Sequence, residues 1–213
     1  MSANPARKPG RPKDPDLEQR RKAQILDTAA RGFAGFGFAG TDVQVIADRL
    51  GVGKGTVYRY FPTKEDLFLA AVERGLLELN AEMDAVMAEP LEPVDLLREA
   101  VRRYLLFFHR RPEMAELFIH ERAAFPHHHR PLYFATKADE KCKHDEFYHR
   151  LAASGLVRPI SQERFFAVIG DLLYGTILTN LLSGRPSDPA AQAEDVLDVV
   201  LHGVLVRGGE GSK

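Results

Sequence analysis

The sequence has one cysteine and no tryptophan among its 213 residues, and its formal net charge at pH 7 is only -1. Cys142 alone cannot form an internal disulfide, which excludes a small secreted domain held together by disulfides. The low net charge and a hydrophobic share of 45% exclude a chain that is disordered throughout. Arg, Lys and Pro occupy the first residues, where a signal peptide needs about 7–15 consecutive apolar residues. We therefore expect a folded cytoplasmic protein.

A second absence concerns β-structure, because no segment alternates convincingly between apolar and polar residues with a period of two. Apolar residues recur at helical spacing instead, and glycines and prolines separate the periodic segments. We therefore predict an all-α fold of about nine helices. The expected ranges run from about residue 17 to the glycines at 35 and 37, and then cover 43–50, 56–61, 64–88, 94–110, 113–124, 131–153, 162–183 and 189–206.

Charge is distributed unevenly along the chain. Residues 1–64 contain 12 Lys and Arg against 6 Asp and Glu, a balance of +6, whereas the remaining residues carry -7. A basic head on an acidic body suggests a polyanionic partner that binds one end of the molecule. Residues 1–16 are rich in proline and poor in apolar side chains, so we expect a flexible basic arm. Its Gly10-Arg11-Pro12 core resembles a minor-groove AT-hook, although a solubilising tail is the favoured interpretation.

Two short predicted helices in the basic head have the spacing of a helix-turn-helix. The first follows the capping residue Asp42 and ends at Gly51, and Gly53 to Gly55 leads into the second. Two helices of about two turns, joined by a short turn that contains glycine, are typical of this motif. Thr63 and Asp66 then resemble a capping box that opens a long connecting helix.

This segment resembles the DNA-binding head of the TetR/AcrR family of bacterial transcriptional regulators, because its motif residues fall at the same relative positions. The resemblance is carried by residues 41–61, TDVQVIADRLGVGKGTVYRYF, and by the KEDL sequence of residues 64–67. It covers the first third of the chain, and the rest matches only in the number and lengths of its helices. The resemblance implies a flexible arm at 1–16, a DNA-binding head at 17–64, a ligand-binding and dimerisation body at 65–207, and a tail at 208–213.

The second short helix carries the residues best suited to contact DNA. Near the N-terminus of a helix in the major groove, Lys54 and Arg59 can donate to guanine edges or phosphates, and Gly55 permits close approach of the backbone. Asp42 stands where the family usually has Ser or Thr; because an acid repels phosphate, we interpret it as a helix cap alone. The family pattern places Gln44, Lys54, Gly55 and Arg59 near bases, and Thr41, Thr56, Tyr58, Tyr60 and Lys64 on phosphates.

The last two predicted helices, 162–183 and 189–206, are apolar on nearly every side. A helix that packs against a single core needs one apolar face, so these two need a second buried surface. We predict a homodimer in which both helices pack against their symmetry mates in a four-helix bundle. The alternatives are a central helix in a monomeric bundle and, for residues 165–182, a membrane span; polar residues such as Asp171 and Asn180 argue against the span.

The resemblance also implies a binding site for a small-molecule inducer of unknown identity within the body. Aromatic and apolar side chains line such pockets, with a few polar groups as anchors. The candidate lining residues are Tyr104, Phe107, Phe108, Phe118, Phe134, Phe147, Phe166 and Tyr174, and the candidate polar anchors are His109, His120 and Arg122.

No motif indicates catalysis or a resident cofactor. The run His127-His128-His129 suggests a metal site, but consecutive histidines point in different directions and no HExxH or paired Cys-His spacing accompanies them. We therefore expect no metal and no enzymatic activity. The sequence favours a ligand-responsive, dimeric repressor that is released from a palindromic operator by its inducer. The rival hypotheses are an enzyme whose aromatic, histidine-rich body hydrolyses a substrate or carries a metal, and a nucleoid-associated or adaptor protein that binds DNA without an inducer.

Overall fold

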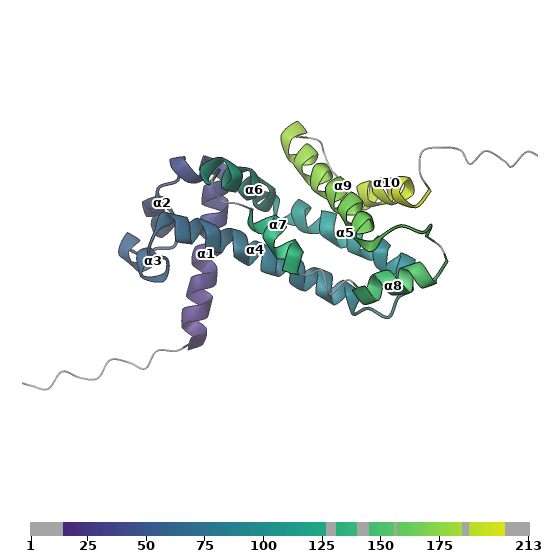
Figure 1. The fold of residues 1–213 in the computed structure, drawn as a ribbon. Helices are drawn as coiled ribbons and strands as arrows, with labels where there is room; N and C mark the ends of the chain where they lie inside the picture. Colours follow the sequence, from purple (N-terminus) through teal and green to yellow (C-terminus); the bar gives the residue numbers. More distant parts are fainter. Residues whose placement is uncertain (1–14, 127–130, 140–144, 156, 185–187, 203–213) are drawn as a thin grey trace, which may run out of the picture.

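The structure, a computed structural model, describes residues 15–126, 131–139, 145–155, 157–184 and 188–202. Within these ranges it contains ten α-helices and no strand, which confirms the predicted all-α class (Figure 1). The helices are α1 (Pro15–Gly40), α2 (Val43–Arg49), α3 (Lys54–Tyr60), α4 (Lys64–Met87), α5 (Pro93–Arg110), α6 (Pro112–Ala124), α7 (Leu132–Asp139), α8 (Asp145–Ala153), α9 (Gln162–Ser183) and α10 (Pro189–His202).

The first helix is longer than its sequence predicts. It continues through Gly35, where we expected it to stop, and its backbone breaks at Gly37 with φ 69° and ψ 171°. Residues with a Cβ rarely adopt such a positive φ, so only the second of the two glycines acts as the breaking residue. The short segment up to Gly40 then changes direction ahead of α2.

Local capping determines where α2, α3 and α4 begin. The Asp42 side chain accepts a hydrogen bond from the Gln44 N–H, as expected of an N-cap. Extended backbone at Gly53 starts α3 at Lys54, two residues earlier than predicted. Thr63 and Asp66 exchange hydrogen bonds in a complete capping box, which confirms the predicted start of the connecting helix α4.

An aromatic cluster joins the head to the body. Phe33 and Phe38 of α1 pack edge-to-face against Phe68 of α4, with ring centroids 5.1 and 5.5 Å apart. Phe125, at the end of α6, contacts Phe38 at 4.9 Å and Phe68 at 5.7 Å. Because α6 also packs along α1, the first helix of the head rests on both the connecting helix and the body.

The body is a layered packing of helices around α5. Both α4 and α10 pack on α5, and α9 contacts α5, α6 and α10, while α7 and α8 pack on α4 and α5 respectively. Figure 1 shows α2 and α3 at one end of the molecule, with α9 and α10 toward the other. The prediction of one helix over 131–153 is wrong, because the chain forms α7 and α8 as separate helices; residues 140–144 lie outside the described ones.

One stripe of α9 is buried in the chain, and the rest is not. The buried residues Phe165, Ile169, Leu173 and Ile177 follow one another at intervals of four. Val168 and Leu172 remain 48% and 39% exposed, and Val199 of α10 is 47% exposed. Among the described residues, α9 is also long and apolar enough to span a membrane by length and composition, a test that core helices of soluble proteins pass as well.

Candidate nucleic-acid interface

Polar and cationic side chains gather on the outer side of α2 and α3. Val57 and Ile46 are buried beneath them, as the helical periodicity predicts, and Phe61 closes the same small core. Arg59 and Gly55 are exposed, and the other members are partly exposed. We call this surface the α2–α3 face; its residues are Gln44, Lys54, Gly55, Thr56, Tyr58, Arg59 and Tyr60.

Thr41, a predicted phosphate contact, lies beneath the surface and outside the α2–α3 face. The residue is 5% exposed. Its hydroxyl lies 2.7 Å from the Gly37 carbonyl oxygen and 3.2 Å from that of Gly32, and its N–H donates to Gly37. The side chain therefore fastens the start of α2 to α1.

Carboxylates hold two of the predicted base-reading side chains. The Lys54 ammonium lies 3.0 Å from the Asp42 carboxylate. The Gln44 amide donates to Asp48 at 2.7 Å. The pKa of Asp42 is lowered mainly by the hydrogen bond from the Gln44 N–H and, to a smaller extent, by the one from Lys54. The hydrogen bond to Asp42 in turn raises the pKa of Lys54. Both groups therefore stay charged near neutral pH.

Cation–π contacts orient the basic groups around α3. The Arg59 guanidinium lies 5.2 Å from the centroid of the Tyr60 ring. Lys22 of α1 reaches over Phe61 at 5.7 Å, which brings an additional cation to the end of α3. Lys22 adds to the basic charge of the head, but no local pattern in the sequence links it to a residue 39 positions later, so its contact with Phe61 was not predictable.

Lys64 lies at the junction between α1 and α4. Its ammonium donates to the Ala39 carbonyl at 3.1 Å and lies 5.0 Å from the centroid of the Phe38 ring. An ammonium has three N–H groups, so this geometry leaves donors for a phosphate while fixing the position of the charge.

The sequence of the head matches a known family. Residues 25–71 match the family described as bacterial regulatory proteins, tetR family. The head belongs to the TetR family. The chain is 36% identical over 85 residues to the uncharacterized HTH-type transcriptional regulator YhgD of Bacillus subtilis. Those 85 residues cover 40% of this chain and 42% of YhgD. The chain is 33% identical over 104 residues to the HTH-type transcriptional regulator RutR of Escherichia coli, 49% of each chain.

These sequence matches span about half the length of the curated relatives. A solved structure extends the likeness in fold over the body: FadR of Bacillus subtilis, in complex with stearoyl-CoA, superposes with a TM-score of 0.67 at 19% identity. That superposition covers 86% of this chain and 99% of FadR. The relatives are transcriptional regulators, so the family has a DNA-binding, non-enzymatic role.

In the body, most of the predicted inducer contacts form one aromatic cluster. Tyr104, Phe108, Phe118, Phe134 and Tyr174 come from four different helices and join Tyr133 in a chain of ring contacts. The hydroxyls of Tyr104 and Tyr133 lie 2.6 Å apart and are buried. Burial is the main cause that raises the pKa of Tyr104 well above its ordinary value, and the neighbouring Tyr133 is the second cause. Phe107 extends this cluster through its contact with Phe108.

Four of the predicted inducer contacts, His120, Arg122, Phe147 and Phe166, lie elsewhere. Arg122 donates to the Pro126 carbonyl oxygen at 2.8 Å, at the exposed end of α6. His120 points out of the body toward α1, where its Nε2 lies 3.3 Å from the Ala34 carbonyl oxygen and its ring approaches Gly37. Phe166 packs in a separate group with Phe147, Tyr148 and Phe165. His120 thus belongs to the contact between α6 and the head, because the packing of α6 along α1 turns that side of the helix away from the body core.

A hollow of about 290 Å³ lies between α5, α6 and α9. Of the predicted pocket residues, Phe108 and the candidate anchor His109 line it. The wall also includes Pro112, at the corner between α5 and α6, and Asn180 of α9. The full set of lining residues is Leu105, Phe108, His109, Pro112, Ala115, Ile177, Asn180, Leu181 and Gly184. A mixed apolar and polar lining of this kind suits a small organic molecule.

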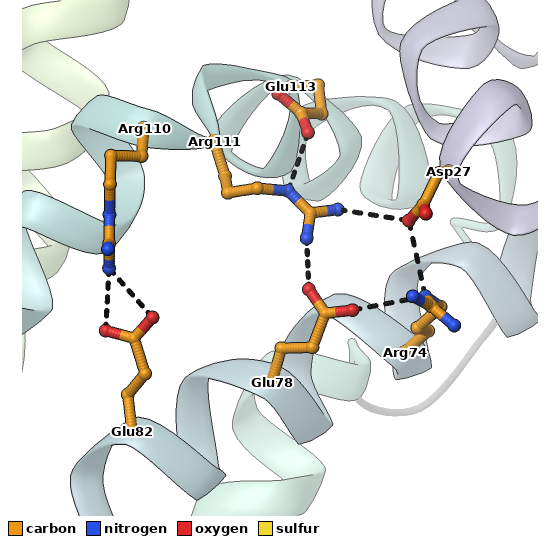
Figure 2. A network of polar contacts seen from close by, with 7 residues as sticks. All are labelled: Asp27, Arg74, Glu78, Glu82, Arg110, Arg111 and Glu113. Atoms are coloured by element: carbon orange, nitrogen blue, oxygen red, sulfur yellow. Dashed lines mark hydrogen bonds and ion pairs between the residues drawn. The ribbon is translucent and has the colours of Figure 1, made fainter. Parts of the chain in front are cut away.

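A charged network connects this corner to the head (Figure 2). Arg111, between α5 and α6, binds Glu78 of α4, donates to Glu113 at 2.8 Å and lies 3.8 Å from Asp27 of α1. Arg74 of α4 bridges the same Asp27 and Glu78 at 3.3 and 3.1 Å. Three helices that are distant in sequence therefore meet around two arginines.

Among the described residues, no group of three or more His, Cys, Asp or Glu side chains is arranged to hold a metal ion. Several sequence predictions fall outside the described residues. These are most of the basic arm with its Gly10-Arg11-Pro12 core, the run His127-His129, Cys142 and the tail at 208–213.

Proposed function

We propose that this chain is a sequence-specific, ligand-responsive transcriptional regulator that acts as a homodimeric repressor and without catalysis. The observation that carries the proposal is the α2–α3 face, where basic and hydroxyl side chains stand over a small apolar core on a helix-turn-helix. In this proposal α3 enters the major groove, with Gln44, Lys54, Gly55 and Arg59 near bases and Thr56, Tyr58, Tyr60 and Lys64 on phosphates. Lys22 adds a phosphate contact at the end of α3.

The exposed apolar side chains of α9 and α10 support dimerisation through these two helices. Val168, Leu172 and Val199 lie outside the single-chain core, and a hollow of about 310 Å³ runs along α9 past Gly175. A glycine on the surface of a helix permits another helix to approach closely. A two-fold dimer would present two heads to the two halves of a palindromic operator.

The proposed inducer binds in the body, next to the aromatic cluster, and acts through the corner between α5 and α6. The hollow touches His109 and Pro112, and the intervening Arg111 holds both α4 and α1. A ligand that moves this corner would change the contacts between α4 and the head, and with them the spacing of the two α3 helices. The ligand can shift DNA affinity only by its own difference in affinity between the two states.

Selection of bound sequences from a random duplex pool by the purified protein tests this proposal. We expect a palindrome with half-site centres about one helical turn apart. Arg59→Ala should relax the base preference within each half-site, whereas Lys64→Ala should weaken binding to all sequences and lower the salt slope by about one.

The outcomes separate this proposal from its rivals. A pool that stays random, with binding that depends on salt alone, would favour a nucleoid-associated protein over a specific regulator. Wild-type binding by both Arg59→Ala and Lys64→Ala at several salt concentrations would show that neither the α2–α3 face nor the adjoining Lys64 contacts the operator. Stoichiometric metal with hydrolytic activity in the purified protein would favour the enzyme.

A further inference from the structure

A negative charge stands at the edge of the α2–α3 face. Asp42 accepts hydrogen bonds from the Gln44 N–H at 2.8 Å and from the Lys54 ammonium at 3.0 Å. The side chains of Asp42 and Lys54 are 60% and 40% exposed, so both can reach a ligand on this surface. A surface that only binds phosphates is expected to carry cations and no carboxylate at such a position, because a carboxylate repels the DNA backbone.

Capping alone does not require this charge. Ser, Thr or Asn at an N-cap also accepts a hydrogen bond from the second or third residue of the helix, with similar stabilisation. The carboxylate differs from these residues in its contact with Lys54, at the first position of α3. Together the two side chains place an acceptor and a donor 3.0 Å apart at the start of the recognition helix.

This arrangement of donor and acceptor matches one edge of DNA. In the major groove a G·C pair presents the N7 and O6 acceptors of guanine beside the N4 amino donor of cytosine. Lysine is a common partner of guanine there, and aspartate can accept from the cytosine amine. An A·T or T·A pair presents a different order of groups and a methyl group.

Building on the proposed function, we propose that Asp42 is a specificity-determining residue that acts as a pair with Lys54. In the operator complex the pair stays together and reads one G·C base pair, with Lys54 donating to guanine and Asp42 accepting from cytosine. On other sequences the pair is electrically neutral, so Lys54 contributes little to the attraction of the phosphate backbone. The carboxylate therefore lowers non-specific binding while it supports specific binding.

The variant Asp42→Asn tests this role, because Asn retains the helix cap and removes the charge. Binding is measured to the selected operator, to the operator with the G·C pair replaced by A·T, and to a scrambled duplex, at about 50 and 200 mM salt. For the scrambled duplex we expect the salt slope of Asp42→Asn to steepen by about 0.9. The preference for G·C over A·T should fall about tenfold.

Two further variants make the result specific to the pair. Glu73→Gln removes an equal charge from an exposed site along α4 and should leave both readouts unchanged. In a Lys54→Met background, Asp42→Asn should no longer steepen the salt slope, because the lysine that it releases is absent. Equal thermal melting temperatures of wild type and Asp42→Asn would establish that the cap is intact.

The inference is overturned if Asp42→Asn and Glu73→Gln change scrambled-duplex binding equally, or if the G·C preference survives in Asp42→Asn. It is also overturned if the effect of Asp42→Asn persists without Lys54, since the charge would then act without the pair. If the wild type selects a palindrome and any of these results appears, this inference alone fails. If the wild type selects no sequence, the proposed function fails as well.

Discussion

The α2–α3 face and the outer side of α9 and α10 are both exposed, but their chemistry is opposite. The first carries Arg59, Lys54 and tyrosine hydroxyls over a closed core, and nearly every apolar side chain beneath it is buried. The second exposes Val168, Leu172 and Val199 in the single chain. A charged surface is stable in water until a polyanion displaces its counterions, whereas an apolar surface gains free energy by leaving water. The contrast supports the two proposed partners, a nucleic acid at one end and a second protein chain at the other.

The largest effect is expected when a charge is placed on the exposed apolar side of α9. Leu172→Glu would bury a carboxylate twice in a two-fold dimer, so we expect the dimer dissociation constant to rise by about a hundredfold or more. Light scattering should report twice the 23.8 kDa chain mass for the wild type and a single chain for the variant. Leu77→Glu on α4, where the leucine is 61% exposed, is the matched control and should remain dimeric. Identical masses for wild type and Leu172→Glu would refute the assignment of this interface.

The second prediction concerns the core that supports the α2–α3 face. Phe68 is fully buried against three other phenylalanines of α1 and α6. Phe68→Ala should lower the free energy of unfolding by about 3–5 kcal/mol, through lost burial and the cavity that remains. Phe36→Ala, at a position 61% exposed, should change it by less than about 0.5 kcal/mol. Urea denaturation measures both, and equal effects would contradict the observed packing.

A third prediction tests the connection between the two ends. Arg111→Met retains the apolar stem and removes the charge that Glu78, Glu113 and Asp27 share. We expect a loss of about 1–2 kcal/mol in the free energy of unfolding, because partly buried carboxylates lose their partner. Arg110→Met removes an exposed pair with Glu82 and should cost at most about 0.5 kcal/mol.

Hydrogen exchange sharpens this third comparison. If Arg111 couples the body to the head, Arg111→Met should increase amide exchange in both α1 and α4, while Arg110→Met should leave α1 unchanged. Increased exchange confined to the α5–α6 corner would mean that the network is local.

The smallest effect is expected within the body. Tyr104→Phe removes the hydroxyl contact with Tyr133 and should cost about 1 kcal/mol at neutral pH. Because burial raises the pKa of Tyr104, the folded state holds its phenol proton more tightly than the unfolded state does. That contribution is complete below a pH of about 10 and is lost above it. The stability of Tyr104→Phe should therefore fall less between about pH 9.5 and 11 than that of wild type, and parallel curves would contradict this assignment.

Elements that depend on neighbouring residues were predictable from the sequence. Spacings of two to four residues predict the N-cap at Asp42 and the capping box of Thr63 and Asp66. They also predict that Ile46 and Val57 point inward. The TetR motif itself is such a set of local spacings. The excess of apolar side chains on α9 and α10 was visible in the same way, because a helix of known period has too few inward positions to bury them all.

Contacts between distant segments were decided by the tertiary structure. Thr41 is buried because the carbonyls of Gly32 and Gly37 approach it from α1. His120 faces α1 and not the body core, because α6 lies along α1. The Lys54–Asp42 pair and the Arg111 network likewise depend on how helices cross. Amphipathic periodicity therefore determined by itself that this chain is helical, that its head is a helix-turn-helix and which faces turn inward. The packing of those helices determined which polar groups remain exposed on the α2–α3 face and which hold the protein together, because long-range contacts have no fixed spacing along the sequence.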